Sequence, residues 1–249
     1  MQLNILEIDI GNTRIKWRMK GDTAGGAEGA AGTVAELQAS DFASQAPDLV
    51  RIANVRADDS LANLQDWITD NWAVESHVAQ VSSQCGGVRN GYSDVSRMGV
   101  DRWLAMVAAY EQLSSACLVV SAGTALTIDL LTAEGEHQGG YILPGLNMMA
   151  SALQEGTGIR LQHEVADTST RPGRITEAAV YNAALAACAA LIEKCCAELG
   201  QSEGRVAVVL CGGDAGQIKD ALNDSGFDVL ISPNLVLDGL ALACPQPKA

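Results

Sequence analysis

The chain has 249 residues and is acidic, with 30 Asp and Glu against 16 Lys and Arg and a formal net charge of −14. This charge opposes binding to nucleic acid or to an anionic membrane, because phosphate groups are recognised by basic patches. Apolar residues make up 48% of the sequence, as in globular proteins, and no run approaches the roughly 20 apolar residues of a membrane span. The first residues lack the basic region and cleavage site of a signal peptide, so we expect a cytoplasmic protein.

The first part of the chain alternates short apolar strands with two helices. We expect strands at residues 3–9, 14–19, 49–55 and 76–81, and helices at 60–72 and 101–113. Ser60 precedes an apolar pattern of helical spacing and is expected to be an N-cap. Residues 20–33 and 85–98 show no periodicity and are expected to form loops.

The second part of the chain repeats the opening pattern of strand, glycine turn and strand. Strands are expected at 117–120, 125–131, 137–141, 205–210 and 227–231, and helices at 146–153, 176–199, after Asp214 and at 235–243. The pattern predicts an α/β fold of two halves that share a central cleft. We place the boundary near residues 114–116, which gives domains at 1–115 and 116–249.

The first glycine turn carries residues suited to a nucleotide phosphate. Asp9 ends a strand, where a carboxylate can hold a hydrated Mg²⁺, and Gly11 permits a tight turn with outward-facing amides. Asn12 and Thr13 add side-chain donors, and Lys16 adds a positive charge. An ordinary β-hairpin with a side-chain bond from Asp9 explains the same residues equally well.

Two further glycine turns follow strands in the second half. Ser121-Ala122-Gly123-Thr124 stands where the first turn stands in the first half, and Gly212-Gly213 follows a buried strand and precedes a helix. Two such hairpins can grip one phosphate chain from both sides, and the third turn suits a nucleoside. Each turn alone has a structural explanation, but the three together favour a nucleotide-binding protein.

Asp101 is the candidate for proton transfer. It stands where a loop enters a helix, and a carboxylate held there can accept the proton of a substrate hydroxyl that attacks a phosphate. Acidic residues are also favoured electrostatically at helix N-termini, and from the residues alone this second explanation is the stronger.

Four segments resemble those of type III pantothenate kinases, which belong to the acetate and sugar kinase, Hsp70 and actin superfamily: D-x-G-N-T-x-x-K at 9–16, G-V-D-R-W at 99–103, G-T-A at 123–125 and G-G-Y-I-x-P-G at 139–145. The resemblance covers nearly the whole chain. It implies two ribonuclease H-like (actin-like) halves and a homodimer. It also implies ATP-dependent phosphorylation of pantothenate to 4′-phosphopantothenate, the first step of coenzyme A biosynthesis, with Mg²⁺ and a monovalent cation such as K⁺ or NH₄⁺.

The resemblance also assigns roles to residues. It implies that Asp101 is the general base and that Arg102 holds the substrate carboxylate. It further implies that the substrate pocket includes Gly99, Val100, Tyr92 and Thr176, and that ATP is bound by Asp9, Gly11, Asn12, Thr13, Lys16, Gly123 and Thr124. From the position of the third glycine turn, we expect Gly212 and Gly213 to bind ATP as well.

One departure from the family pattern affects the expected cation site. The family usually has Asp, which binds the monovalent cation, where this chain has Ser121. A neutral hydroxyl is a weaker cation ligand than a carboxylate, so we expect ATP and Mg²⁺ binding but a weakened or rebuilt monovalent-cation site.

Three other functions compete with pantothenate phosphorylation. The first is a kinase for another small alcohol, which Arg102 restricts to substrates with a carboxylate. The second is a regulatory accessory protein of the same fold; the acidic charge opposes direct DNA contact, and Asp9, Asp101 and Arg102 favour an active enzyme. The third is an actin-like polymerising ATPase, for which the chain is short.

Overall fold

The computed structural model describes residues 3–21, 26–162, 168–223 and 225–244, which form two compact units. Among these described residues, the first unit takes those up to Gly86, Tyr92–Ala108 and those from Asn234 onward, and the second takes Gly87–Gly91 and those of Ala109–Pro233. These units differ from a single division at residue 115 in one main respect: the last segment groups with the first unit.

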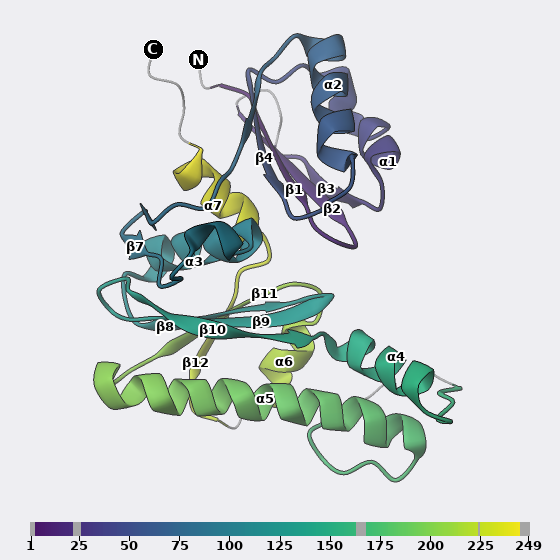
Figure 1. Ribbon diagram of the computed structural model, residues 1–249, viewed down its shortest axis with the longest axis vertical. Coiled ribbons are helices and arrows are strands. Elements are labelled where there is room, and N and C mark those ends of the chain that lie inside the picture. Colours follow the sequence, from purple (N-terminus) through teal and green to yellow (C-terminus); the bar gives the residue numbers. More distant parts are fainter. Residues whose placement is uncertain (1–2, 22–25, 163–167, 224, 245–249) are drawn as a thin grey trace. The chain divides into compact units, whose positions relative to one another are not determined.

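The first unit is built on a five-stranded sheet of order β3-β2-β1-β4-β5 (Figure 1). Its strands are β1 (Ile5–Ile10), β2 (Ile15–Lys20), β3 (Glu28–Ala31), β4 (Leu49–Asn54) and β5 (Ser76–Val78). β1 pairs antiparallel with β2 and parallel with β4. The carboxyl ends of β1 and β4 therefore lie side by side, and the loops that leave them are neighbours.

The two faces of strand β1 carry different kinds of residues, apolar on one face and acidic on the other. Successive side chains of a strand point to opposite faces of the sheet. Leu6, Ile8 and Ile10 belong to a buried cluster with the helices α1 (Val34–Gln38) and α2 (Ser60–Trp72). Glu7 and Asp9 consequently face the other side of the sheet.

The last helix completes this unit. α7 (Leu235–Ala243) packs against β4 and against the start of α3 (Val100–Leu113), in a buried cluster that includes Ala53, Leu104 and Leu237. A side chain at Gly239 would overlap the backbone of Leu104, so glycine is required for this close approach.

The second unit repeats the topology of the first. Its sheet has the order β10-β9-β8-β11-β12 and consists of β8 (Cys117–Ala122), β9 (Ala125–Leu131), β10 (His137–Pro144), β11 (Ala207–Cys211) and β12 (Asp228–Ile231). β8 pairs antiparallel with β9 and parallel with β11, as β1 does with β2 and β4. Figure 1 shows α5 (Thr176–Glu203) and α6 (Ala215–Ala221) on one face of this sheet, and α4 (Leu146–Gly156) follows β10.

Most predicted elements are confirmed, and the differences have local causes. β3 and α1 were missed because they are short and the Gly- and Ala-rich stretch around them shows no alternation. Asp59, and not Ser60, occupies the N-cap position of α2. The loop expected at 85–98 contains short strands β6 (Gln84–Cys85) and β7 (Val88–Arg89) and a 3-10 helix, Val95–Arg97.

In the parts of the chain that the structure describes, no helix is both long and apolar enough to cross a bilayer. The same parts contain no group of three or more His, Cys, Asp or Glu side chains arranged to hold a metal ion.

Candidate active site

The first glycine turn closes the hairpin of β1 and β2. The ladder ends at the pair Ile10 and Ile15, and the Gly11 amide donates to the Arg14 carbonyl at 3.1 Å. Asn12 and Thr13 at the tip are exposed. The hairpin thus presents two hydrogen-bonding side chains to solvent from a turn fixed at its base.

Asp9 lies below this turn with an unusual carboxyl group. Its Oδ1 atom is buried, and no described residue forms a hydrogen bond with it. The pKa of Asp9 is raised to about 7, chiefly by burial and also by the negative charge of Asp101, while Lys16 partly opposes the shift. Lys16 is the cross-strand neighbour of Asp9. A buried carboxylate oxygen without a partner is costly unless a cation or donor completes the site.

The donor set at Asp9 fits a hydrated Mg²⁺. Mg²⁺ prefers oxygen ligands and is usually held by one or two carboxylates, together with water and substrate phosphates. Asp9 offers such an oxygen, and the second carboxylate, Asp101, lies close enough to affect its pKa. A cation at this position would offset the charge repulsion between the two carboxylates.

Asp101 stands in the first turn of α3. Its Oδ1 accepts a hydrogen bond from the Arg102 amide at 2.8 Å, and its side chain is half-buried. A Cβ at Gly99 would come within 2.6 Å of this Oδ1 atom, so a larger residue there would displace the carboxylate. Gly99 therefore leaves room for Asp101.

Arg102 is held by Tyr92. The Arg102 Nη1 atom donates to the Tyr92 hydroxyl at 2.7 Å, and its guanidinium carbon lies 5.5 Å from the centre of the Tyr92 ring. Arg102 is 5% exposed and Val100 is also buried. A buried guanidinium held in one orientation is suited to a planar carboxylate.

In the second unit, two loops meet at the end of strand β8. The Gly123 amide donates to the Ala125 carbonyl at 3.1 Å, and the Gly145 amide donates to the Thr124 carbonyl at 2.9 Å. Thr124 is exposed. The sequence predicts Ser121 in the turn, but the structure places it in strand β8. There it pairs with Thr127 of β9 and with Cys211 of β11.

The third glycine turn joins the same end of the sheet. Gly212 has a φ of 96°, which favours glycine, and a Cβ there would overlap the Ala122 carbonyl. The Asp214 amide donates to that carbonyl at 3.0 Å, and Gly213 is exposed. The glycine thus lets the turn after β11 pack directly on β8.

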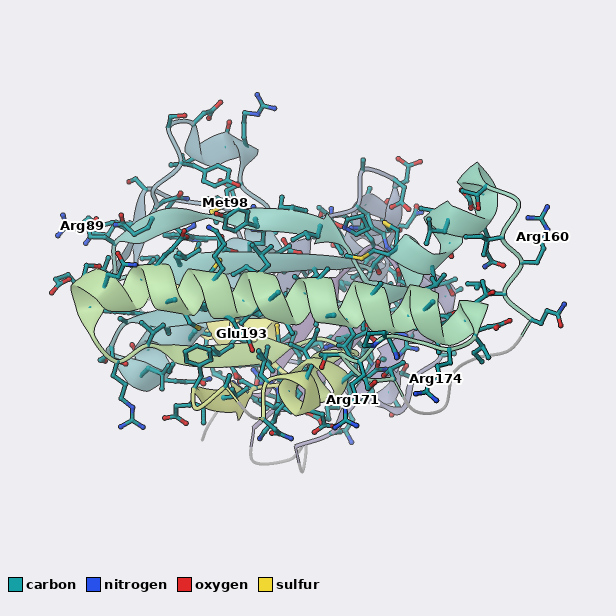
Figure 2. The ribbon with its side chains drawn as sticks, turned by 90° about the horizontal axis from the view of Figure 1, so that it is seen from below. Arg89, Met98, Arg160, Arg171, Arg174 and Glu193 are labelled. Atoms are coloured by element: carbon teal, nitrogen blue, oxygen red, sulfur yellow. The ribbon has the colours of Figure 1, made fainter. Side chains whose placement is uncertain are left out.

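Thr176 is the first residue of α5 and is exposed, while Ile175 occupies the N-cap position. Figure 2 shows the side chains of Arg171 and Arg174 pointing outward from the segment that precedes this helix. Both arginines are exposed, so this end of α5 carries positive charge on an otherwise acidic chain.

The predicted site residues fall into two groups, one in each unit. The first unit holds Asp9, Gly11, Asn12, Thr13, Lys16, Tyr92, Gly99, Val100, Asp101 and Arg102, and the second holds Ser121, Gly123, Thr124, Thr176, Gly212 and Gly213. Sequence reasoning missed Arg56, whose Nε atom donates to the Gly11 carbonyl at 2.7 Å. The sequence does place Arg56 just after β4. Because β4 is the parallel neighbour of β1, a residue at this position is expected to lie near the turn that follows β1.

Solved structures first place the fold in a class. The chain is similar to a conserved putative Baf family transcriptional activator from Campylobacter jejuni, with a TM-score of 0.59, 17% identity and 94% of each chain covered. It is also similar to a putative 2-dehydro-3-deoxygalactonokinase from Sinorhizobium meliloti, with a TM-score of 0.56, 17% identity, and 95% and 97% coverage. With the repeated five-stranded sheets, these neighbours confirm the predicted fold of two actin-like α/β halves.

Sequence relatives then identify the family. Residues 5–198 match the family model described as type III pantothenate kinase. A relative named type III pantothenate kinase from Ectopseudomonas mendocina (strain ymp) is 39% identical over 254 residues, covering 97% of this chain and 99% of its own. The chain belongs to the type III pantothenate kinase family.

Proposed function

We propose that this protein transfers the terminal phosphate of ATP to pantothenate, giving ADP and 4′-phosphopantothenate, the first step of coenzyme A biosynthesis. The observation that carries this function is the arrangement in the first unit: two carboxylates, Asp9 and Asp101, interact electrostatically, and the next residue along the chain is a buried arginine held by Tyr92. Family membership supports the same activity.

In this proposal Asp101 acts as the general base. The oxygen of the pantothenate hydroxyl attacks the terminal phosphorus of ATP, and the bond from that phosphorus to the ADP oxygen breaks. The hydroxyl proton passes to the Asp101 carboxylate and from there to solvent. Gly99 keeps space beside this carboxylate, and the Arg102 amide fixes one of its oxygens.

Arg102 would recognise the carboxylate of pantothenate. It is buried and already oriented by the Tyr92 hydroxyl, so little side-chain freedom is lost when a carboxylate binds. Val100 and Gly99 would line the same pocket, and Thr176 is proposed as a further substrate-binding residue.

The ATP phosphates would be bound by the Gly11 turn through Asn12 and Thr13, with Lys16 nearby, and by the turns at Gly123-Thr124 and Gly212-Gly213. Asp9 would hold Mg²⁺ through water. When bound, the ion would neutralise negative charge on the ATP phosphates during transfer of the terminal phosphate.

A homodimer, a cytoplasmic location and a weakened monovalent-cation site complete the proposal. The edge strand β10 exposes Tyr141 and Ile142, the latter 64% exposed, and α4 exposes Met148 and Leu153. An apolar edge of this kind favours association with a second copy. Ser121 lies in β8 with a neutral hydroxyl, which supports a reduced dependence on K⁺ or NH₄⁺.

The activity is tested by measuring ADP release from purified protein with ATP and Mg²⁺, with and without pantothenate. We expect release to depend on pantothenate and to change little when Na⁺ replaces K⁺. No stimulation of folded protein by pantothenate in either salt would contradict the activity. Stimulation only by another hydroxy acid would instead support a kinase for a different carboxylate-bearing alcohol, the alternative that Arg102 favours.

The state of Asp9 predicts a pH-dependent stability of the metal-free protein. Its folded-state pKa of about 7 exceeds the ordinary value of 3.8, so its contribution to stability is lost as pH rises through about 7. In EDTA, Asp9→Asn should therefore melt at a higher temperature than wild type at pH 8, and this difference should shrink at pH 5.5. Added Mg²⁺ should stabilise wild type at pH 8 more than the variant.

Thermal melts at the two pH values check this expectation. Asp66→Asn is a matched control, because Asp66 is an exposed carboxylate on α2 in the same unit. A difference between wild type and Asp9→Asn that is the same at both pH values would mean that Asp9 does not titrate in this range.

A further inference from the structure

Arg56 lies against the backbone of the glycine turn that follows β1. Its Nε atom donates to the Gly11 carbonyl at 2.7 Å, and its Nη2 atom reaches the Gly32 carbonyl at 3.4 Å. One guanidinium group therefore joins the turn of residues 11–14 to the segment that follows β3. The two bonds differ in strength, since 2.7 Å is short for a charged donor and 3.4 Å is long.

The backbone around Arg56 is itself fixed. The Val55 amide donates to the Ile10 carbonyl at 3.1 Å, which continues the alignment of β4 with β1. The Asn54 side chain accepts from the Arg56 amide at 3.1 Å and donates to the Arg56 carbonyl at 3.0 Å. The arginine thus starts from a rigid base and does not have to be ordered when a ligand binds.

Arg56 also lines an open pocket beside the turn. This cavity of about 330 Å³ is bounded by Asn12, Thr13, Gly32, Arg56, Ala57 and Asp58. The two exposed residues of the turn and Arg56 therefore border the same space. Asp58 brings a negative charge to this pocket, but its Oδ1 already accepts from the Ser60 amide at 3.0 Å.

The repeat of topology points to the same loop. In the second unit, the turn after β11 packs on the end of β8 through the Asp214 amide. β4 holds the position in the first sheet that β11 holds in the second. Arg56 therefore stands in the counterpart of the Gly212 turn. In the second unit, glycine and backbone contacts join this turn to the end of β8. In the first unit, an arginine side chain joins the corresponding loop to the turn after β1.

We propose that Arg56 is a positioning residue for the nucleotide phosphates. Its hydrogen bond to the Gly11 carbonyl fixes the direction of the turn at residues 11–13. Its guanidinium also brings a positive charge to the pocket that Asn12 and Thr13 border. This inference rests on the proposed ATP site at the turn. On a chain with a net charge of −14, a local cation of this kind offsets the general repulsion of a polyphosphate.

The test is steady-state kinetics of the full chain with Arg56→Met and Arg56→Lys. Methionine keeps much of the aliphatic stem but removes both hydrogen bonds and the charge. We expect the KM for ATP to rise about tenfold or more, the size of effect that one charged hydrogen bond carries. The KM for pantothenate should stay within about twofold, because the guanidinium of Arg56 binds the backbone carbonyls of Gly11 and Gly32, beside the turn proposed for ATP.

Arg56→Lys separates charge from geometry. An ammonium group keeps the charge but lacks the planar fork that reaches two carbonyl groups from one side chain. We expect an intermediate KM for ATP. A wild-type KM for ATP in Arg56→Lys would overturn the clamp, and so would equal increases in both KM values in Arg56→Met, since that pattern indicates a general loss of structure.

Two controls distinguish the possible failures. Arg205→Met removes one charge from an exposed arginine of the second unit, which is paired with Asp228 at 3.4 Å, and should leave both KM values unchanged. Thr13→Ala tests the turn itself. If Thr13→Ala raises the KM for ATP and Arg56→Met does not, the inference about Arg56 is wrong. If neither variant does, the turn is not the phosphate site and the proposed site fails with it.

Discussion

Asp101→Asn should lower kcat by about 10²- to 10⁴-fold, the usual contribution of general base catalysis, with much smaller changes in both KM values. Asparagine has nearly the same shape, and its carbonyl oxygen can still accept the hydrogen bond from the Arg102 amide at the start of α3. What it cannot do is take a proton from the substrate hydroxyl. Initial rates of ADP release over a matrix of ATP and pantothenate concentrations measure this effect.

The same experiment separates a base from a metal ligand. Because Asp101 also raises the pKa of Asp9, it lies close enough to influence a cation held there. A variant with normal kcat and a raised KM for ATP would assign Asp101 to cation binding and remove it as the base. Asp66→Asn, which changes an exposed carboxylate of α2, should keep wild-type kinetics.

Glu7→Ala should destabilise the protein by about 3–5 kcal/mol, the usual cost of leaving buried charges without their partner. Glu7 is fully buried and binds Arg18 at 2.6 Å, Arg51 at 3.1 Å and Lys20 at 3.4 Å. Alanine would leave two largely buried guanidinium groups without this counter-charge. Denaturant unfolding of the full chain, monitored by far-UV circular dichroism, gives the change in free energy.

The effect extends to the last helix because Arg18 also binds Asp238 of α7 at 2.7 Å. Loss of Glu7 should therefore loosen α7 as well as the sheet, which hydrogen exchange of the α7 amides would reveal. Glu75→Ala, at an exposed position of the same unit, should change the free energy by no more than about 0.5 kcal/mol. A cost below about 1 kcal/mol for Glu7→Ala would show that the cations find other partners or water.

The sequence predicted the parts of the fold that depend on local patterns. Alternating apolar residues and glycine turns located both hairpins, at 5–20 and 117–131, and helical spacing located α2 and α3. These signals are local because strand and helix periods place neighbours in the sequence on one face of an element. The repeat of two hairpins was visible for the same reason, and it led to the two halves that the structure shows.

The chemistry of the candidate site depends on long-range contacts and was only partly predictable. That Asp9 is buried beside Asp101, with a raised pKa, follows from the packing of α3 near β1, more than ninety positions apart in the sequence. The contact of Arg56 with the Gly11 carbonyl spans 45 positions and leaves no periodic signal. The roles of Asp101 and Arg102 came from resemblance to a family and not from spacing.

The placement of α7 with the first unit affects how the protein is made. The second unit is nearly continuous in sequence, but the first collects segments from the beginning, the middle and the end of the chain. During synthesis the second sheet can form as soon as β12 has left the ribosome. The first unit waits for the last helix, whose Leu237 and Leu240 complete its buried cluster with Leu104. The two carboxylates proposed for catalysis therefore reach their final surroundings only after α7 has been translated.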